Sequence, residues 1–331
     1  MVTRHSSERV IILKIEEIIK EIQTIDVTSK DNFYTLIPLE DKYGPFFGKN
    51  CEGDICFVVQ SRSAHPRQSS RKTQELILIL DIECCFDING QQNEMLSNIL
   101  VCNSRDESDI AAFIRLCTAF ASDDLNSHSI VDLFSALTRL FSTKRPTDAN
   151  VITGLFGELY TIYFFESMGT EITKYWQKKD LMKFDFTISP TKKMEVKTVI
   201  GTERKHHFKH EQLFYEDYDI VIVSIMIRES NQGISVYDLV DYCRKKFSSD
   251  YDRLNIIENR ISNYSDDELR KVVYDRKYLE DHIKFIPASN VPRFREKSPN
   301  NLSNAEYDCV LEGSMDLEVG TVKSWIASGG F

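Results

Sequence analysis

Residues 184–198 read FDFTISPTKKMEVKT, and this stretch decides the predicted fold. Apolar and polar residues alternate on both sides of Ser189-Pro190-Thr191, which is typical of two half-buried strands joined by a turn. Side chains of a strand point alternately to opposite faces, so a core built from the apolar row places the other row on the opposite face. That row holds Asp185, Glu195 and Lys197. The stretch therefore predicts a β-hairpin on which two carboxylates and one amine converge.

Such a group of side chains suits the hydrolysis of a phosphodiester. Carboxylate oxygens hold hard divalent cations, and a cation neutralises the charge that gathers on the phosphate during in-line attack by water. A neighbouring lysine can orient or help to deprotonate the water, because the pKa of a lysine falls readily when it is desolvated or lies near a metal. In a chain with 28% charged residues, however, the spacing of Asp185, Glu195 and Lys197 alone is a weak signal.

The segments on either side of the hairpin strengthen this interpretation. In residues 154–165, Leu155, Leu159 and Ile162 recur at helical spacing, and Glu158 lies among them. A carboxylate among core positions is costly unless it is paired or binds a metal. Residues 220–227 form a continuous apolar run, which indicates a strand covered on both faces. The predicted order is helix, hairpin, short helix and buried strand.

These segments, together with Trp176 and Gln212-Leu213, resemble a bacterial family of PD-(D/E)XK proteins, whose members are often associated with phage-defence or restriction loci. Asp185 matches the first acid of the motif and Glu195-Val196-Lys197 matches its E-x-K half, although Phe184 stands in place of the proline. The resemblance is strongest from Thr147 to Ile227. It implies a restriction-endonuclease-like core.

The resemblance also implies roles for individual residues. Mg²⁺, for which Mn²⁺ can substitute, would be bound by Glu158, Asp185 and Glu195 with the carbonyl of Val196. Lys197 would position the attacking water, and Gln212 would support the site from the following helix.

Composition narrows the class of protein. The chain has 331 residues, of which 42% are hydrophobic, so it is long enough for about two domains. A net charge of −10 argues against a protein that coats nucleic acid without specificity. No run of about 18 apolar residues occurs, so we expect no membrane span and a cytoplasmic location. The eight cysteines lack paired C-x-x-C spacing, which favours buried thiols over a zinc site.

The predicted fold class is α/β (α+β), in three parts. Residues 1–145 form an antiparallel β-rich domain with connecting helices, residues 146–246 form the nuclease-like core, and residues 247–331 form a helical and mixed extension. An apolar stripe along residues 250–275 indicates a solvated helical pair or, alternatively, the seam of a homodimer. The predicted strands are 32–39, 46–49, 55–60, 75–88 and 95–102 in the first part, and 171–176 as the first strand of the core sheet.

Two basic segments are candidates for contact with DNA phosphates. The loop of residues 61–74 contains no acidic residue, and residues 202–213 are locally basic beside the catalytic hairpin. A solvated hairpin tip is the alternative for the loop, and zinc binding by the histidines of the second segment is disfavoured for lack of an accompanying acid or cysteine pattern. The predicted contacts are Arg62, Arg67, Arg71 and Lys72 in the loop, and Arg204, Lys205, His207 and Lys209 in the second segment.

The leading hypothesis is a Mg²⁺-dependent DNA endonuclease of restriction or phage-defence type. The alternative is a noncatalytic nuclease-fold subunit that binds nucleic acid or other subunits of a defence complex. A third interpretation is structural ion pairing among Glu158, Asp185 and Lys197. An intact E-x-K with a third acid favours activity, because a scaffold has no need of clustered buried charge.

Overall fold

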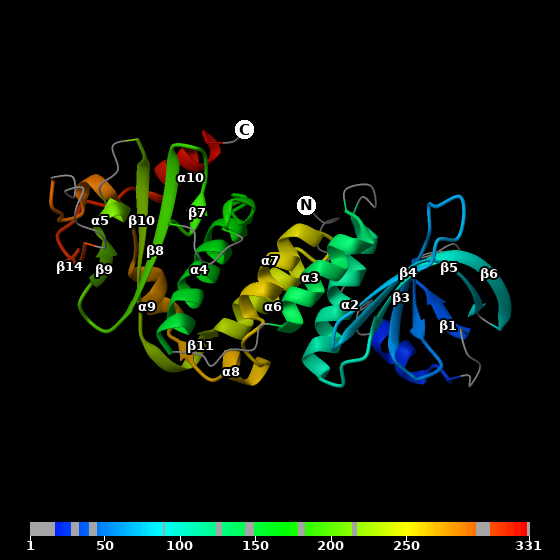
Figure 1. The fold of residues 1–331 in the computed structure, drawn as a ribbon. Coiled ribbons are helices and arrows are strands. Elements are labelled where there is room, and N and C mark those ends of the chain that lie inside the picture. Colours follow the sequence, from blue (N-terminus) through cyan, green and yellow to red (C-terminus); the bar gives the residue numbers. More distant parts are fainter. Residues whose placement is uncertain are drawn as a thin grey trace. The chain divides into compact units, whose positions relative to one another are not determined.

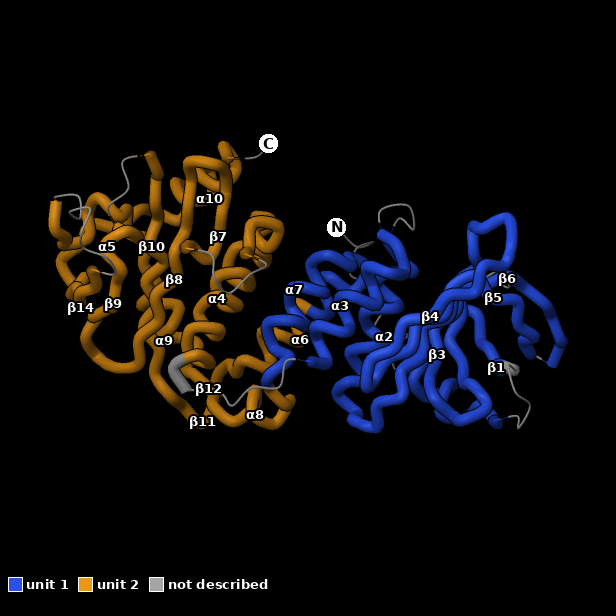
Figure 2. Tube along the Cα trace, viewed as in Figure 1, with its two compact units in different colours: residues 1–145, 244–263 blue, residues 146–243, 264–331 orange. Residues whose placement is uncertain are grey.

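The computed structural model describes residues 17–27, 33–39, 45–88, 90–123, 128–142, 149–177, 183–213, 217–295 and 305–329. Both helices and strands occur along the chain, which confirms the predicted mixed class. The chain forms two compact units: unit 1 comprises residues 1–145 and 244–263, and unit 2 comprises residues 146–243 and 264–331 (Figure 2). Residues 247–331, which the predicted layout made a separate extension, are divided between the two units at residue 263. Residues 143–148, around the first boundary, lie outside the described ranges.

Unit 1 contains a six-stranded sheet in the order β1-β2-β3-β6-β5-β4, in which β1 also pairs with β5. This extra pairing closes the sheet on itself, and it is parallel, whereas all other pairs are antiparallel. The prediction of a wholly antiparallel sheet is wrong at this pair. The strands are β1 (Phe33–Pro38), β2 (Phe46–Lys49), β3 (Ile55–Gln60), β4 (Ser69–Lys72), β5 (Leu76–Ile88) and β6 (Gln91–Cys102).

A bulge in β5 allows the closure. The register between β5 and β6 shifts between Ile79 and Ile82, and Asp81 has a φ of 52°, a conformation that few residues other than glycine adopt. Before the bulge Leu76 and Leu78 face one core, and after it Ile82 faces another. The bulge therefore bends the strand, and beyond it the side chains at even-numbered positions point to the opposite face of the sheet.

Helices cover one face of this sheet. Leu76 and Leu78 of the sheet pack in one buried cluster with apolar residues of the helices, such as Phe113 and Leu137. The opposite face forms a second cluster made of strand residues alone, including Leu36 and Phe86. The helical segments are residues 17–24, α2 (Glu107–Ser122), α3 (Ile130–Ser142) and α7 (Tyr251–Ile261).

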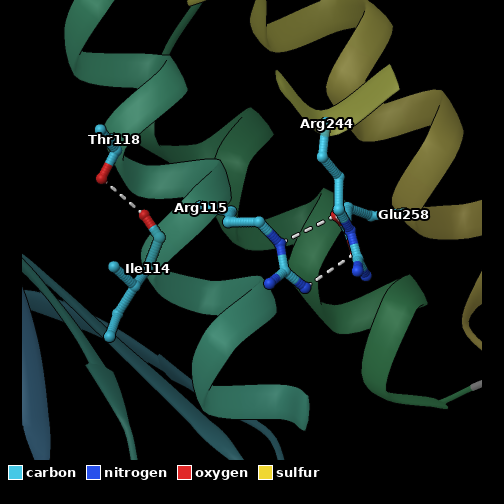
Figure 3. Close-up of polar contacts among 5 residues, drawn as sticks. All are labelled: Ile114, Arg115, Thr118, Arg244 and Glu258. Carbon is cyan, nitrogen blue, oxygen red and sulfur yellow. Dashed lines mark hydrogen bonds and ion pairs between the residues drawn. The ribbon is translucent and has the colours of Figure 1, made fainter. Parts of the chain in front are cut away.

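A buried ion triad joins the helices of unit 1 (Figure 3). Glu258 of α7 forms ion pairs with Arg115 of α2 and with Arg244, near the end of α6 (Val236–Lys246). The distances from each Nε to Glu258 Oε1 are 3.0 and 2.8 Å. Both guanidinium groups also donate to Oε2, at 3.3 and 3.1 Å. Burial by itself would raise the pKa of Glu258, but the two cations outweigh it and lower the pKa to about 2.

Unit 2 is built on a four-stranded sheet in the order β13-β10-β8-β7 (Figure 1). The pair β8–β10 is parallel, and the edge pairs are antiparallel. The predicted buried strand is confirmed as β10, whose side chains from Ile220 to Ile227 are all buried. The strands are β7 (Phe186–Thr187), β8 (Lys192–Ile200), β10 (Asp219–Ile227) and β13 (Ile283–Pro287).

Two short ribbons and several helices surround this sheet. One ribbon pairs β9 with β14, and the other pairs β11 with β12. The ribbon strands are β9 (Lys205–Lys209), β11 (Glu229–Ser235), β12 (Val273–Tyr274) and β14 (Glu306–Val310). The helices are α4 (Ala149–Ser167), α5 (His210–Leu213), α8 (Asp266–Arg270), α9 (Arg276–Asp281) and α10 (Val319–Ala327). The two 3₁₀ turns are η1 (Thr173–Tyr175) and η2 (Ala288–Asn290).

Gly157 lets α4 lie close against β8 (Figure 1). A Cβ at this position would come within 1.9 Å of the Thr198 hydroxyl and 3.2 Å of a Val196 methyl group. Since Val196 and Thr198 alternate with Glu195 and Lys197 along the strand, α4 covers the face of β8 opposite to that acid and lysine. Gly157 also places the next residue, Glu158, beside the strand.

Candidate functional site

Glu195 and Lys197 lie together on one face of β8. Lys197 Nζ is 2.9 Å from Glu195 Oε1, and Glu195 is buried with 5% of its surface exposed. Gln212 of α5 donates from Nε2 to the same Oε1 at 2.6 Å, and its Oε1 accepts from Lys197 Nζ at 3.3 Å. The Lys209 main-chain N–H donates to Gln212 Oε1 at 3.1 Å and so fixes the amide. Gln212 thus bridges the acid and the lysine.

Asp185 lies at the edge of the sheet. The register of Phe186 with Met194 places Asp185, one residue before β7, opposite Glu195. The Val196 main-chain N–H donates to Asp185 Oδ2 at 2.7 Å. The Asp185 carboxylate therefore accepts the hydrogen bond that a neighbouring strand would otherwise accept from the Val196 N–H, because β7 begins only at Phe186. Because the N–H and C=O of one strand residue point to the same side, the Val196 carbonyl also points to this edge.

Glu158 comes from α4, the helix that packs against β8. Its Oε2 accepts a hydrogen bond of 2.6 Å from the indole N–H of Trp176. Gly157 sets this position, because the helix that carries Glu158 packs on the Val196 and Thr198 side of the strand. Asp185 is thus opposite Glu195 in the register, Glu195 lies beside Lys197, and Glu158 comes from the adjacent helix.

The electrostatics of Glu195 are unfavourable to a carboxylate. Burial first, and then the negative charge of Asp185, raise the pKa of Glu195 to about 8; Lys197 lowers it in part, and Glu158 adds to the rise. Within the described residues, Glu195 Oε2 is buried and accepts no hydrogen bond. A buried carboxyl oxygen with no donor is costly, so the arrangement calls for a further positive group.

The donor set fits a hard divalent cation. Asp185, Glu195 and the Val196 carbonyl offer oxygen ligands at one strand end, and Glu195 Oε2 has no hydrogen-bond donor among the described residues. No group of three His, Cys, Asp or Glu side chains in the described ranges is arranged as a ready metal site. Asp185, Glu195 and the Val196 carbonyl would hold the cation, and Glu158, the third acid predicted as a ligand, adds a charge that acts on Glu195.

The second basic segment has a different role from the one predicted. Strand β9 alternates in burial, so its residues are divided between two faces. Arg204, just before the strand, is buried with 2% exposed, and its guanidinium donates to the Ser224 carbonyl and hydroxyl, both at 2.8 Å, and to the His282 carbonyl at 2.7 Å. The prediction that Arg204 contacts phosphates is wrong, because its charge is enclosed by the protein.

The exposed cations of β9 face acids on β14. Lys205 Nζ lies 3.0 Å from Asp308, and the ring nitrogens of His207 lie 3.0 Å from Asp308 and 3.2 Å from Glu306. Hydrogen bonds to these acids raise the pKa of His207. Since these charges are already matched, Lys205 and His207 offer less to a phosphate than the sequence indicated; Lys209 is exposed.

The other histidine of this strand is enclosed. His206 Nε2 is hydrogen-bonded to the Ser224 hydroxyl at 2.7 Å, and burial first, then the charges of Arg204 and Lys197, lower its pKa to about 3. A histidine that stays neutral beside two cations is not poised as a proton donor at neutral pH. His206 therefore has a structural role, as a buried neutral side chain near Lys197.

The first basic segment is exposed, as a phosphate contact requires. Arg62, Arg67, Arg71 and Lys72 all face solvent, the last two on β4. The sequence predicted a loop for residues 61–74, and β4 within it was missed because its polar residues carry no alternation. This segment belongs to unit 1, whereas the acids belong to unit 2.

Trp176 is the site residue whose partner the sequence did not reveal. The predicted strand at residues 171–176 is instead the 3₁₀ turn η1, followed by a single antiparallel bridge between Trp176 and Phe186. Trp176 is buried, with 2% of its surface exposed. A buried indole N–H needs a hydrogen-bond acceptor. A tryptophan that follows a helix carrying an acid was therefore the available sequence signal for the bond between Trp176 and Glu158.

Fold and site together define a mixed α+β protein with a nuclease-like core, in which the middle of an E-x-K strand lies beside a further acid. The chain belongs to the family described as putative PD-(D/E)XK family member (DUF4420), whose model matches residues 20–312. No curated protein and no solved structure matches the chain. Among the described helices, none has the length and apolar character needed to span a membrane.

Proposed function

We propose that the protein is a metal-dependent endonuclease that hydrolyses phosphodiester bonds of DNA. The observation that carries the proposal is Glu195: a buried carboxyl with one oxygen that accepts no hydrogen bond within the described residues, beside Asp185 and 2.9 Å from Lys197. A purely structural buried carboxylate would be surrounded by enough positive charge to keep it ionised, as Glu258 is by two arginines. Here one lysine pairs with a buried carboxyl on which the charges of Asp185 and Glu158 also act, and a cation would restore the balance.

Each residue of the site would have a distinct role. Asp185, Glu195 and the Val196 carbonyl would hold Mg²⁺ or Mn²⁺, with the charge of Glu158 nearby. The cation, when bound, neutralises charge on the phosphate and acidifies water. Lys197, as an ammonium group, would orient the attacking water through Nζ and stabilise negative charge on the phosphate. Gln212 holds Nζ and the Glu195 carboxyl in register.

DNA would be held in part by the basic segment of unit 1. Arg62, Arg67, Arg71 and Lys72 are exposed, and no acidic residue lies between residues 61 and 74. Phosphate contacts of this kind position a duplex without reading its sequence. The sequence resembles a family whose members are often associated with restriction or phage-defence loci, and we extend that role to this protein.

A noncatalytic subunit that binds nucleic acid or a partner protein is the second candidate. The observation in its favour is that the described residues contain no ready group of three metal-binding side chains. In this case the charges at β8 would serve recognition or structure. The two candidates differ in whether Lys197 matters for bond cleavage.

Cleavage of DNA in Mg²⁺ or Mn²⁺ by the full chain tests the proposal. Lys197→Met should bind metal like the wild type yet lose at least about a hundredfold in cleavage rate, since general base or water-positioning groups contribute about 10²- to 10⁴-fold. Glu195→Gln should lose both properties. The matched control is Lys174→Met, at an exposed lysine of unit 2 that pairs with Glu171. DNA binding without metal binding or cleavage would favour the noncatalytic candidate.

A further inference from the structure

Trp176 connects two acids of the site through different parts of one residue. Its indole N–H donates to Glu158 Oε2 at 2.6 Å, and its main chain forms an antiparallel bridge with Phe186, next to Asp185. The following residue, Gln177, donates its main-chain N–H to the Asp185 carbonyl at 3.0 Å. The segment therefore fixes the Glu158 carboxylate by a side chain and the Asp185 backbone by main-chain bonds.

The turn before Trp176 is itself anchored to α4. Glu166, near the end of that helix, accepts with one oxygen from the main-chain N–H groups of Ile172 and Thr173 and from the Thr173 hydroxyl, at 3.0, 3.1 and 2.8 Å. The Trp176 main-chain N–H then donates to the Thr173 carbonyl at 3.1 Å. The helix that carries Glu158 thus also holds the turn that presents the indole. This closed frame restricts the indole to one position.

The choice of acid at position 158 indicates more than structural support. A buried indole needs an acceptor, and the neutral amide of a glutamine would provide one at the same position. Glu158 instead brings a negative charge close enough to act on Glu195, which already lies beside Asp185. Like charges near one another are unfavourable in the absence of a cation. A charge kept in such a place, and held by a dedicated donor, suits a site that receives a cation.

We propose that Trp176 is a positioning residue of this site: its indole N–H holds the Glu158 carboxylate beside β8, where the charge of Glu158 joins those of Asp185 and Glu195 in attracting a divalent cation. This inference rests on the proposed function, because it assigns a partner to the proposed metal site. Hydrogen-bond partners of ligand groups tune metal sites, and their removal commonly weakens metal affinity by about 10- to 100-fold.

The two tryptophans of the chain provide a matched pair of variants. Trp325 also donates its indole N–H to a carboxylate, that of Asp219, at 2.5 Å, yet it lies outside the site. Calorimetric titration of the full chain with Mg²⁺ should show that Trp176→Phe weakens the affinity about tenfold, whereas Trp325→Phe changes it less than about twofold. Glu158→Gln, which keeps an acceptor for the indole but removes the charge, should stay folded and lose affinity as well.

Nuclear magnetic resonance of the full chain with ¹⁵N-labelled tryptophan gives a second readout that needs no change at position 176. Only two indole N–H signals are expected, and Trp325→Phe assigns them. Mg²⁺ should shift the Trp176 signal with the midpoint found by calorimetry and leave the Trp325 signal in place. In Glu158→Gln, the shift should shrink.

The outcomes separate this inference from the proposed function. If Mg²⁺ binds the wild type but neither shifts the Trp176 signal nor binds folded Trp176→Phe more weakly, the positioning role is overturned and the metal site stands. If Trp176→Phe does not fold, the wild-type resonance decides alone. If Mg²⁺ does not bind the wild type, the metal site fails and the inference fails with it.

Discussion

Glu258 in unit 1 and Glu195 in unit 2 are almost equally buried, with 2% and 5% of their surface exposed, but their surroundings have opposite effects. Glu258 lies between two guanidinium groups that lower its pKa to about 2. Burial and Asp185 raise the pKa of Glu195 to about 8 although Lys197 is 2.9 Å away. The first carboxyl is paired with two arginines of its own unit, whereas one oxygen of the second accepts no hydrogen bond within the described residues. Burial of an acid therefore does not by itself distinguish a structural from a functional role; the balance of charge around it does.

The largest expected effect is on the paired acid. Glu258→Gln leaves Arg115 and Arg244 facing a neutral amide, and it should lower the free energy of unfolding by about 3–5 kcal/mol, the usual loss when one partner of a buried pair is removed. Urea unfolding of the full chain, followed by circular dichroism, measures the change. Glu195→Gln is the matched control and should cost less than about 1 kcal/mol at pH 7. Equal losses in the two variants would erase the distinction.

The pH dependence of stability should reveal Glu195 on the alkaline side. Its folded pKa of about 8 exceeds the ordinary 4.5, so between these values the folded state holds a proton that the unfolded state has released. Stability therefore falls as pH rises from about 5 to 8, by as much as a few kcal/mol without metal. Glu195→Gln should flatten this fall and be the more stable protein above pH 8. A wild-type curve that matches the variant throughout would show that Glu195 ionises normally.

Glu258 should act on the acid side with the opposite sign. Its folded pKa of about 2 lies below the ordinary 4.5, so its stabilising effect is complete above pH 4.5 and is lost as pH falls toward 2. Unfolding measured between pH 6 and 3 should show a steeper acid loss for the wild type than for Glu258→Gln, with a difference of about 2 kcal/mol. Parallel curves would mean that the two arginines do not hold the charged form.

Alternation predicted the hairpin and its turn, and a continuous apolar run predicted strand β10, because each depends on residues close together in the chain. The parallel pairing of β1 with β5 depends on a bulge at Asp81 and joins segments about fifty residues apart, so no local pattern announces it. Arg204 was misassigned because its basic neighbourhood was taken as one surface. The alternation of burial along β9 sends its side chains to two faces, and that period was already present in the sequence.

The smallest effect on stability should come from the exposed cations of unit 1. Replacing Arg62, Arg67, Arg71 and Lys72 by glutamine should change the free energy of unfolding by less than about 0.5 kcal/mol per site, as is usual for surface positions. The same variant should bind DNA more weakly whatever its sequence, with a shallower dependence on salt. Lys205→Gln is the control, since this lysine faces Asp308, and it should change DNA affinity less than any of the four. Unchanged affinity in the fourfold variant would assign the segment to solvent.

Calorimetric titration of the wild-type chain with Mg²⁺, alongside its melting curve, tests the central claim most directly. A cation that binds only the folded state raises the melting temperature, and the account predicts such a rise together with a measurable heat of binding. Glu195→Gln should lose most of both, whereas Lys197→Met should keep them. Mg²⁺ and Mn²⁺ that produce neither heat nor a shift in melting temperature at about 10 mM, in a folded wild-type protein, would contradict the claim that Glu195 awaits a cation.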